Sequence, residues 1–300
     1  MSDIVAARIP LPKHYRVQDV LAFHRRDVQA VAERVDEAHL EKGLLWSGQP
    51  ACLSIRFVSD EAQVLLDVDG RTHGADAGRL ESLVRHMLGL NQPVETFEQR
   101  HGKHPVLGPL IKRQRGLRVP LTPDPFEALT WAITGQQISV SAAVSLRRRL
   151  IEACGATHSS GLRCYPDAAR VAGLSADTLR TAGFSTAKTH TLQTLAGLAA
   201  SGELPLDAWA VALPVDEITN ALRSIRGIGP WTVSYALLRG FGFLDGSLHG
   251  DVAVRNSLQR LLGEPERIGE TQAREWLEPF APWRALTAAH LWAALSLASY

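Results

Sequence analysis

Residues 225–240, with the sequence IRGIGPWTVSYALLRG, restrict the fold of this chain more than any other stretch. Gly227 and Gly229 lie two residues apart, and Pro230 follows where a helix would begin. Proline suits the first turn of a helix, and glycine accepts positive φ and leaves the backbone uncovered. The stretch predicts a tight corner with bare amides at the positive end of a helix, which can bind phosphate. A helix–turn–helix corner that needs glycine only for its shape explains the same pattern.

Overall charge does not identify a partner for such a corner. The chain has 32 lysines and arginines against 31 aspartates and glutamates, which gives a formal net charge of +1. A nucleic-acid-binding surface must therefore be local rather than a property of the whole chain. Arg223, Arg226 and Arg239 lie close to the corner in sequence and are the candidates for such a surface.

Cysteine usage predicts neither a disulfide framework nor a metal or other cofactor. Cys52, Cys154 and Cys164 are scattered and odd in number, which is typical of a reducing compartment. The absence of a CxxC pair excludes the usual zinc ribbon and the cysteine-ligated iron–sulfur cluster. The N-terminus lacks the apolar core of a signal peptide, and no long apolar run occurs. We therefore expect a cytoplasmic protein that contacts no membrane.

Hydrophobic patterning divides the chain into three parts. Residues 51–70 alternate apolar and polar side chains and predict a β-hairpin, and residues 76–90 predict an amphipathic helix. Residues 28–46 fit either a helix or strands. Residues 96–124 are rich in proline, glycine and basic side chains, which is typical of a linker.

From residue 125 onward the pattern is helical. Ser175, Ser185 and Asp216 stand where helix N-caps would be, and Gly183 suits the end of a helix. No internal repeat interrupts this region. The sequence thus predicts a mostly α-helical second half.

The segment LRSIRGIGPWTVSYALLR resembles the helix–hairpin–helix of the DNA glycosylase superfamily, with Arg226 in place of the usual proline. Asp251 stands 22 residues after Gly229, at about the spacing of the superfamily's catalytic aspartate. The stretch GQQIS at residues 135–139 resembles the matching stretch of 3-methyladenine DNA glycosylase II, the AlkA type. Residues 164–198 and 281–295 are similar to later helical segments of that family.

The resemblance implies an α+β fold in two domains. Residues 1–95 would form a small antiparallel β-sheet domain on the plan of the TATA-binding protein, residues 96–124 a linker, and residues 125–300 an all-α helix–hairpin–helix glycosylase region. By the same resemblance, residues 28–46 should be strands rather than a helix.

Three aromatic residues and one aspartate are the implied catalytic set. Trp231 and Tyr235 are four residues apart, so they lie on one face of a helix and, with Trp292, would line a pocket for a flipped-out base. Packing in the core explains aromatic residues at this spacing equally well. Asp251 would stabilise the developing positive charge on the sugar and orient water. The same residue is also well placed as a helix N-cap.

The remaining implied site residues would contact DNA. Arg226, Gly227, Ile228 and Gly229 form the hairpin that would bind the phosphate backbone. Gln137 follows the GQ pair, where the AlkA type carries a side chain that fills the gap left by the flipped base. A glutamine that only caps a helix is the alternative.

The implied activity is that of a monofunctional DNA glycosylase acting in base excision repair. Alkylated purines such as 3-methyladenine and 7-methylguanine are cationic, and each aromatic face attracts a cation by roughly 0.5–2 kcal/mol. Glycosylases that also cut the strand use a lysine where this chain has Trp231, so we expect an abasic site as the product. The expected partner is double-stranded DNA containing alkylated bases, and the expected state is a monomer.

Two other functions stay open from the sequence. A protein that binds damaged DNA without cutting it would share the hairpin but would need neither Asp251 nor the aromatic face. A glycosylase for oxidised or deaminated bases would need polar groups for a neutral base edge, and no such set stands out.

Overall fold

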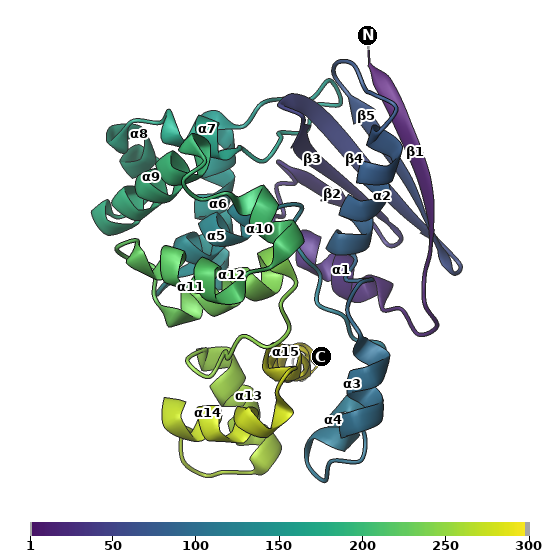
Figure 1. Ribbon diagram of the computed structural model, residues 1–300, viewed down its shortest axis with the longest axis vertical. Helices are drawn as coiled ribbons and strands as arrows, with labels where there is room; N and C mark the ends of the chain where they lie inside the picture. Colours follow the sequence, from purple (N-terminus) through teal and green to yellow (C-terminus); the bar gives the residue numbers. More distant parts are fainter. Residues whose placement is uncertain (1, 298–300) are drawn as a thin grey trace.

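The computed structural model describes residues 2–297, which form a five-stranded antiparallel sheet followed by a mostly helical region (Figure 1). The strands lie in the order β1-β5-β4-β3-β2. They are β1 (Asp3–Pro10), β2 (Glu33–Val35), β3 (His39–Trp46), β4 (Gln49–Val58) and β5 (Glu61–Val68). Helices α1 (Val17–His24) and α2 (Asp76–Met87) pack with the sheet in one apolar core. The expected α+β fold with a small N-terminal sheet is confirmed.

The β-hairpin predicted at residues 51–70 is formed by β4 and β5. Their register pairs Val58 with Glu61 across a two-residue turn, in which Ser59 has a φ of 53°. Val64 and Leu66 of β5 are almost fully buried, whereas Leu65 between them is exposed. The alternation in the sequence therefore does mark the buried and exposed faces of the sheet.

The stretch that fitted either a helix or strands forms strands. Residues 33–35 and 39–46 make β2 and β3, which pair antiparallel with Val35 opposite Leu40. Leu40, Leu44 and Trp46 of β3 are buried in the sheet core. The family resemblance predicted strands correctly. The helical spacing of the valines did not reflect a helix.

Residues 96–124 connect the sheet to the helical region, but they differ from the linker that we expected. They contain most of α3 (Val94–His101) and all of α4 (Leu107–Arg113). Phe97, Leu107 and Ile111 are buried in a core shared with the C-terminal helices. The prolines, glycines and basic residues of this stretch lie around apolar side chains that are spaced for burial.

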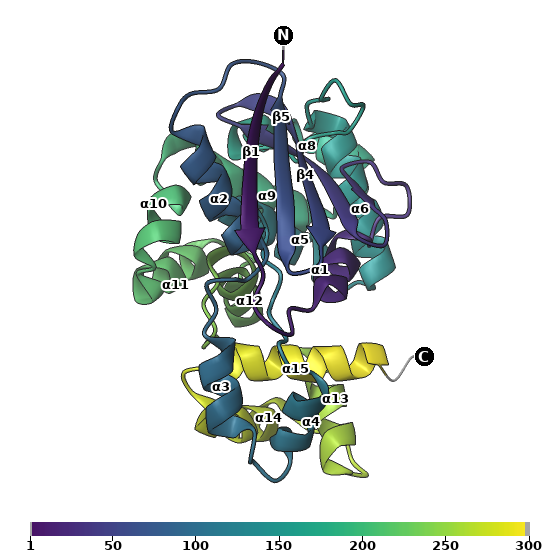
Figure 2. The ribbon, with the colours of Figure 1, turned by 90° about the vertical axis from the view of Figure 1, so that its right-hand side faces the viewer.

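The helical region forms two packed groups. Its elements are α5 (Pro125–Gly135), α6 (Val140–Cys154), α7 (Ala168–Ala172), α8 (Ala176–Thr181), α9 (Thr186–Ser201), α10 (Leu206–Ala212), α11 (Val215–Ser224), α12 (Pro230–Phe241), α13 (Val252–Leu262), α14 (Glu270–Leu277), the 3-10 helix η1 (Glu278–Phe280) and α15 (Arg284–Leu297). Helices α13, α14 and α15 lie with α3 and α4 in a lower lobe, and most of the rest lie above it (Figure 2).

Helix α12 lies between these two groups and contributes to both cores. Its residues Tyr235 and Leu238 pack with the lower lobe, and Val233 and Leu237 pack with the upper group. Since α12 begins directly after the glycine corner, the position of the corner is fixed by a helix that packs in both cores.

Most of the predicted helix ends are confirmed. The hydroxyls of Ser175 and Ser185 cap α8 and α9, and Gly183 follows the end of α8 with a φ of 101°. The prediction for Asp216 is wrong, because the N-cap of α11 is Pro214 and Asp216 lies within the first turn. An acidic side chain there still interacts favourably with the helix dipole.

A buried ionic cluster joins the sheet to the helical region. Lys42 of β3 donates to Glu33 of β2 at 2.7 Å and to Glu127 of α5 at 2.9 Å. Arg147 of α6 donates to the same two carboxylates at 2.8–2.9 Å. Two acids and two bases thus neutralise one another between the two parts of the chain, and we call these four residues the ionic cluster.

Candidate active site

The glycine corner is a hairpin between α11 and α12, and its first glycine is required by the fold. Gly227 has a φ of 94°, a value that residues with a side chain rarely adopt. A Cβ added at Gly227 would lie 2.2 Å from Oγ1 of Thr191. That hydroxyl donates a hydrogen bond to the carbonyl oxygen of Arg226 at 2.9 Å. Helix α9 therefore packs directly against the hairpin at this point.

The second glycine has no such requirement within the protein. Gly229 is the N-cap of α12 with a φ of −95°, so it does not use the positive φ that glycine can adopt. A Cβ added at Gly229 would meet no heavy atom within 4 Å. Pro230 occupies the first turn of α12 as predicted. The protein therefore leaves open space beside the backbone where α12 begins.

The other hairpin residues divide between core and surface. Arg226 is exposed at the tip, whereas the Ile228 side chain is buried in the upper group. Ile228 can therefore offer DNA only its backbone. Arg239, which we placed among the candidates for a basic surface, is buried near the other end of α12. Its position follows from the helical rise, which separates it from the hairpin by the length of the helix.

The three predicted aromatic residues come together from α12 and α15. The rings of Trp231 and Tyr235 have centroids 5.3 Å apart at an angle of 33°, and those of Tyr235 and Trp292 are 6.3 Å apart at 54°. Tyr235 is buried, and the two tryptophans are half-buried. The half-buried indole rings leave aromatic surface accessible beside Asp251.

Asp251 is held at the N-cap of α13 by three neutral donors. Its Oδ1 accepts a hydrogen bond from the backbone N–H of Val254 at 3.0 Å, as the predicted cap requires. The indole N–H of Trp231 donates to Oδ2 at 2.8 Å, and that of Trp292 donates to Oδ1 at 3.1 Å. Within residues 2–297, no basic nitrogen lies within 4.0 Å of this carboxylate. The carboxylate is thus oriented without being neutralised.

Two further side chains lie beside the aromatic set: Phe23, for which we made no prediction from the sequence, and Arg239, which we expected on a basic surface instead. The guanidinium of Arg239 lies 5.6 Å from the Trp292 ring centroid and 4.7 Å from that of Phe23 in α1. Burial lowers the pKa of Arg239 to about 10, and its Nη1 donates to the carbonyl oxygen of Pro120 at 2.7 Å. Phe23 of α1 is thus a residue of the N-terminal part of the chain that lies beside the site. No motif marks Phe23, because its position depends on how α1 packs against the helical region.

The loop between α5 and α6 carries Gln137 beside the hairpin. Gln137 has a φ of 57° and is exposed, and Ile138 next to it is 37% exposed. The amide of the preceding residue, Gln136, donates to the carbonyl oxygen of Gly227 at 2.9 Å. Gln137 does not cap a helix, since Gln136 is the C-cap of α5 and Ser139 is the N-cap of α6. We call residues 136–139 the wedge loop.

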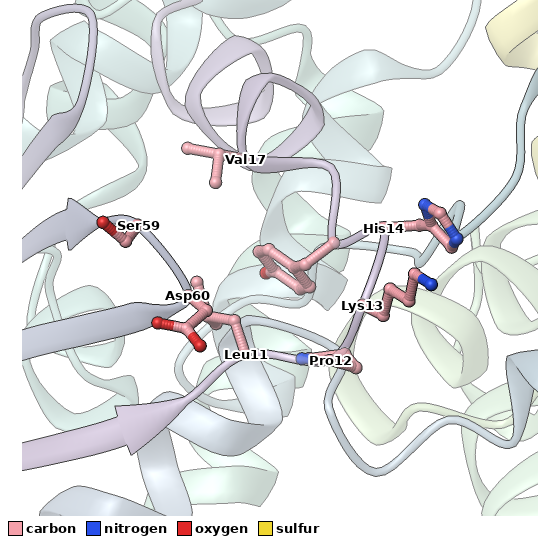
Figure 3. Close-up of a pocket in the computed structure, with 8 residues that line it drawn as sticks. Leu11, Pro12, Lys13, His14, Val17, Ser59 and Asp60 are labelled. Carbon is pink, nitrogen blue, oxygen red and sulfur yellow. The ribbon is translucent and has the colours of Figure 1, made fainter.

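Other features of the described chain lie outside this arrangement. A hollow of about 350 Å³ at one end of the sheet is lined by Leu11, Pro12, Lys13, His14, Tyr15, Val17, Ser59 and Asp60 (Figure 3). None of the predicted site residues lines it. Among residues 2–297, no group of three or more His, Cys, Asp or Glu side chains could hold a metal ion. Over the same range, no helix has the length and apolar character needed to cross a membrane.

Comparison with known proteins finds similarity over nearly the whole chain. Residues 130–282 match the family described as HhH-GPD superfamily base excision DNA repair protein, and residues 7–124 match the AlkA N-terminal domain. A DNA-3-methyladenine glycosylase of Bacillus subtilis is 25% identical over 98% of both chains. DNA-3-methyladenine glycosylase 2 of Escherichia coli is 31% identical over 62% of this chain and 63% of its own length.

Solved structures show the same fold. The 3-methyladenine DNA-glycosylase from Archaeoglobus fulgidus superimposes with a TM-score of 0.81 at 20% identity, and the match covers 96% of this chain and 97% of that one. The chain therefore belongs to the HhH-GPD superfamily of base excision DNA repair proteins and carries an AlkA-type N-terminal domain.

Proposed function

We propose that the protein is a monofunctional DNA glycosylase that flips alkylated purines such as 3-methyladenine and 7-methylguanine out of DNA and excises them. The observation that carries this proposal is the carboxylate of Asp251, which two indole N–H groups orient and which no cation within residues 2–297 neutralises. The names of the relatives support the same class of substrate. We also propose that the protein acts as a monomer in the cytoplasm.

The aromatic residues would receive the flipped base. The Tyr235 ring contacts the rings of Trp231 and Trp292 at angles of 33° and 54°, and the two tryptophans retain exposed surface. A cationic base is attracted to the electron-rich ring faces, whereas its neutral counterpart lacks this attraction. A cationic base is also a better leaving group, so the site needs no strong general acid.

Asp251 would act on the sugar. As the bond between base and sugar breaks, positive charge develops on the sugar ring, and a fixed negative charge stabilises that transition state more than the ground state. The N-cap bond and the two indole bonds hold the carboxylate in place before the reaction begins. The same carboxylate can orient or deprotonate the attacking water.

The hairpin would bind the DNA backbone next to the lesion. The open space over Gly229 lets a phosphate approach the amides of α12, and this explains a glycine that the fold itself does not require. Arg226 would add charge, while Gly227 and Ile228 would contribute backbone groups. Gln137 would enter the duplex from the wedge loop where the base has left.

Base removal without strand cleavage follows from the residue at position 231. Strand-cleaving relatives would need an amine nucleophile there, and this chain has Trp231, whose N–H is already bonded to Asp251. Lys188 of α9, which lies beside the wedge loop, is an amine, but it already donates to the carbonyl oxygens of Thr134 and Gln136. We therefore expect an abasic site with an intact strand.

The test is to incubate the purified protein with oligonucleotides that each carry one defined lesion. 7-Methylguanine and 3-methyladenine should be released, and strand breaks should appear only after heat or alkali. Uracil and 8-oxoguanine serve as neutral lesions and should be released far more slowly. Binding without release of any base would favour the non-catalytic alternative, and preferential release of the neutral lesions would favour the other glycosylase class.

A further inference from the structure

We infer that Gln136 and Lys188 are positioning residues that hold the wedge loop against the hairpin. The hairpin, which would bind the phosphates, and the wedge loop, which would fill the gap, would then keep a fixed position relative to each other. This inference rests on the proposed function, because it assigns the wedge loop and the hairpin to the same DNA. It concerns residues that touch neither the base nor Asp251.

Gln136 bridges the wedge loop and the hairpin through both protons of its amide. Its Nε2 donates to the carbonyl oxygen of Gly227 at 2.9 Å and to Oγ1 of Thr232 at 2.9 Å. A primary amide nitrogen has two N–H donors, so this geometry uses its full capacity. Thr232 is buried in the first turn of α12 and is therefore a fixed acceptor. One side chain thus ties the wedge loop to the tip of the hairpin and to the start of its second helix.

Lys188 fastens the other side of the wedge loop. Its ammonium donates to the carbonyl oxygens of Thr134 and Gln136 at 2.8 Å each. These carbonyls lie at the C-terminal end of α5, where a cation satisfies carbonyls that lack helical partners. Within residues 2–297, no carboxylate lies within 4.0 Å of this ammonium, so the backbone of the loop is its bonding partner.

One face of α9 holds both loops. Lys188 binds the wedge loop, and Thr191, three residues further along the helix, donates to the carbonyl oxygen of Arg226 in the hairpin. Residues three apart lie on the same face of a helix. Helix α9 therefore holds the wedge loop and the hairpin in place from one side, and Gln136 joins them directly.

The purpose of this fastening follows from what the wedge loop exposes. Gln137 is held in the left-handed region, which is strained for a residue with a side chain, and its neighbour Ile138 is 37% exposed. Val140, the first residue of α6, is 66% exposed. A side chain that replaces a base must enter the duplex at a fixed distance from the phosphates that the protein grips. A loop that had to be ordered during flipping would add an entropic cost to the unstacking that flipping already requires.

The experiment compares Gln136→Leu and Lys188→Met with the wild type. Leucine and methionine keep much of the side-chain bulk and remove the donors. Gln193→Leu is the matched control. Gln193 lies on α9, like Lys188, but it bonds to the carbonyl oxygen of Leu174, which belongs to neither the wedge loop nor the hairpin. Single-turnover excision of 7-methylguanine is measured in duplex and in single-stranded oligonucleotides, together with urea unfolding of each protein.

Both test variants should lower the ratio of duplex to single-strand excision by about 10-fold or more, because the loop has no stack to fill in a single strand. The ratio of Gln193→Leu should stay within about 2-fold of the wild type. Equal losses on the two substrates, or no loss on either, would overturn the inference. Thr232→Ser, which keeps one acceptor of Gln136, should retain more of the ratio than Thr232→Val.

A second readout separates this inference from the proposed function. A duplex that carries a tetrahydrofuran abasic analogue beside 2-aminopurine reports insertion of the wedge loop by fluorescence without any bond cleavage. The wild type should change the fluorescence, and Gln136→Leu and Lys188→Met should change it less at saturating protein. If the wild type excised no alkylated base but still showed this difference, the proposed function would fail and the inference would stand. Identical signals from all the proteins would overturn the inference.

Discussion

Two sets of acidic side chains in this protein have opposite surroundings. Glu33 and Glu127 in the ionic cluster are buried, and each accepts hydrogen bonds from Lys42 and Arg147. Asp251 is half-buried and, in the described part of the chain, accepts only from neutral N–H groups. The first arrangement removes charge from the interior, and the second keeps a charge in place.

The pKa values in the ionic cluster reflect that pairing. Burial alone would raise the pKa of Glu33, but Arg147 and Lys42 outweigh burial and hold this pKa well below its usual range. Burial would likewise lower the pKa of Lys42, but Glu127 and Glu33 raise it above its usual value. A buried pair of this kind is costly to break, because the remaining partner is left as an unpaired charge. The comparison teaches that a carboxylate oriented by neutral donors is the one available to stabilise an external cation.

The largest expected effect is that of Asp251→Asn on excision. Asparagine keeps the size of the side chain and its ability to cap α13, but it has no negative charge. We expect single-turnover excision of 7-methylguanine to fall by on the order of 10²–10⁴. Affinity for undamaged duplex DNA, measured in the same preparation, should stay near that of the wild type, since the phosphate contacts lie at the hairpin.

The second prediction concerns the ionic cluster. Glu33→Gln leaves Lys42 and Arg147 to share the carboxylate of Glu127, their remaining acidic partner among residues 2–297. The free energy of unfolding in urea should fall by about 3–5 kcal/mol. Excision per folded molecule should change by less than about 3-fold, because the cluster makes no contact with Asp251. A Glu33→Gln protein as stable as the wild type would contradict the claim that the ionic cluster stabilises the fold.

A smaller effect is expected when one of the donors to Asp251 is removed. Trp231→Phe keeps an aromatic face for the base but loses the N–H that donates to Oδ2. A hydrogen bond to a charged group contributes about 1.5 kcal/mol or more, which corresponds to a loss of excision on the order of 10-fold. If Trp231→Phe excised at the wild-type rate, orientation by the indole groups would be unnecessary.

The smallest predicted effect is a pH dependence on the ionic-cluster side. Burial lowers the pKa of His24, whose Nδ1 lies 3.7 Å from Oε1 of Glu33. The unfolded chain binds a proton at this histidine below about pH 6.5 and the folded protein does so less readily, so stability falls as the pH drops. One such group contributes at most about 1.4 kcal/mol per pH unit. His24→Gln should flatten the decline in unfolding free energy between about pH 7 and pH 5.5, and an unchanged slope would contradict this account.

Much of the site could be predicted because its residues lie close together in sequence. The hairpin glycines, Trp231, Tyr235 and Asp251 all fall within residues 227–251, where local spacing and a family resemblance fix their relation. The N-cap role of Asp251 followed from the helix pattern alone. The reason for Gly229 did not, because its φ is ordinary and only the space beside it explains the absence of a side chain.

The parts that could not be predicted depend on packing between distant segments. Phe23 of α1 and Arg239 of α12 meet only because the N-terminal part of the chain packs on the helical region. The family resemblance implied Trp292 as a pocket residue, but its bond to Asp251 depends on where α15 packs in the lower lobe. Helices α3 and α4 were missed because their prolines, glycines and basic residues conceal the spacing of their apolar side chains. Local composition describes a segment by itself, and burial is decided by its partners.

The most direct test of the comparison is a crossed measurement on Asp251→Asn and Glu33→Gln, with single-turnover excision and urea unfolding determined on the same samples. We predict that Asp251→Asn loses on the order of 10²-fold or more in excision while its unfolding free energy falls by no more than about 2 kcal/mol, since the amide oxygen keeps the cap bond and only the bond from Trp231 is lost. Glu33→Gln should show the reverse. Near-normal excision by folded, DNA-binding Asp251→Asn would contradict the central claim that the unneutralised charge of Asp251 drives the reaction.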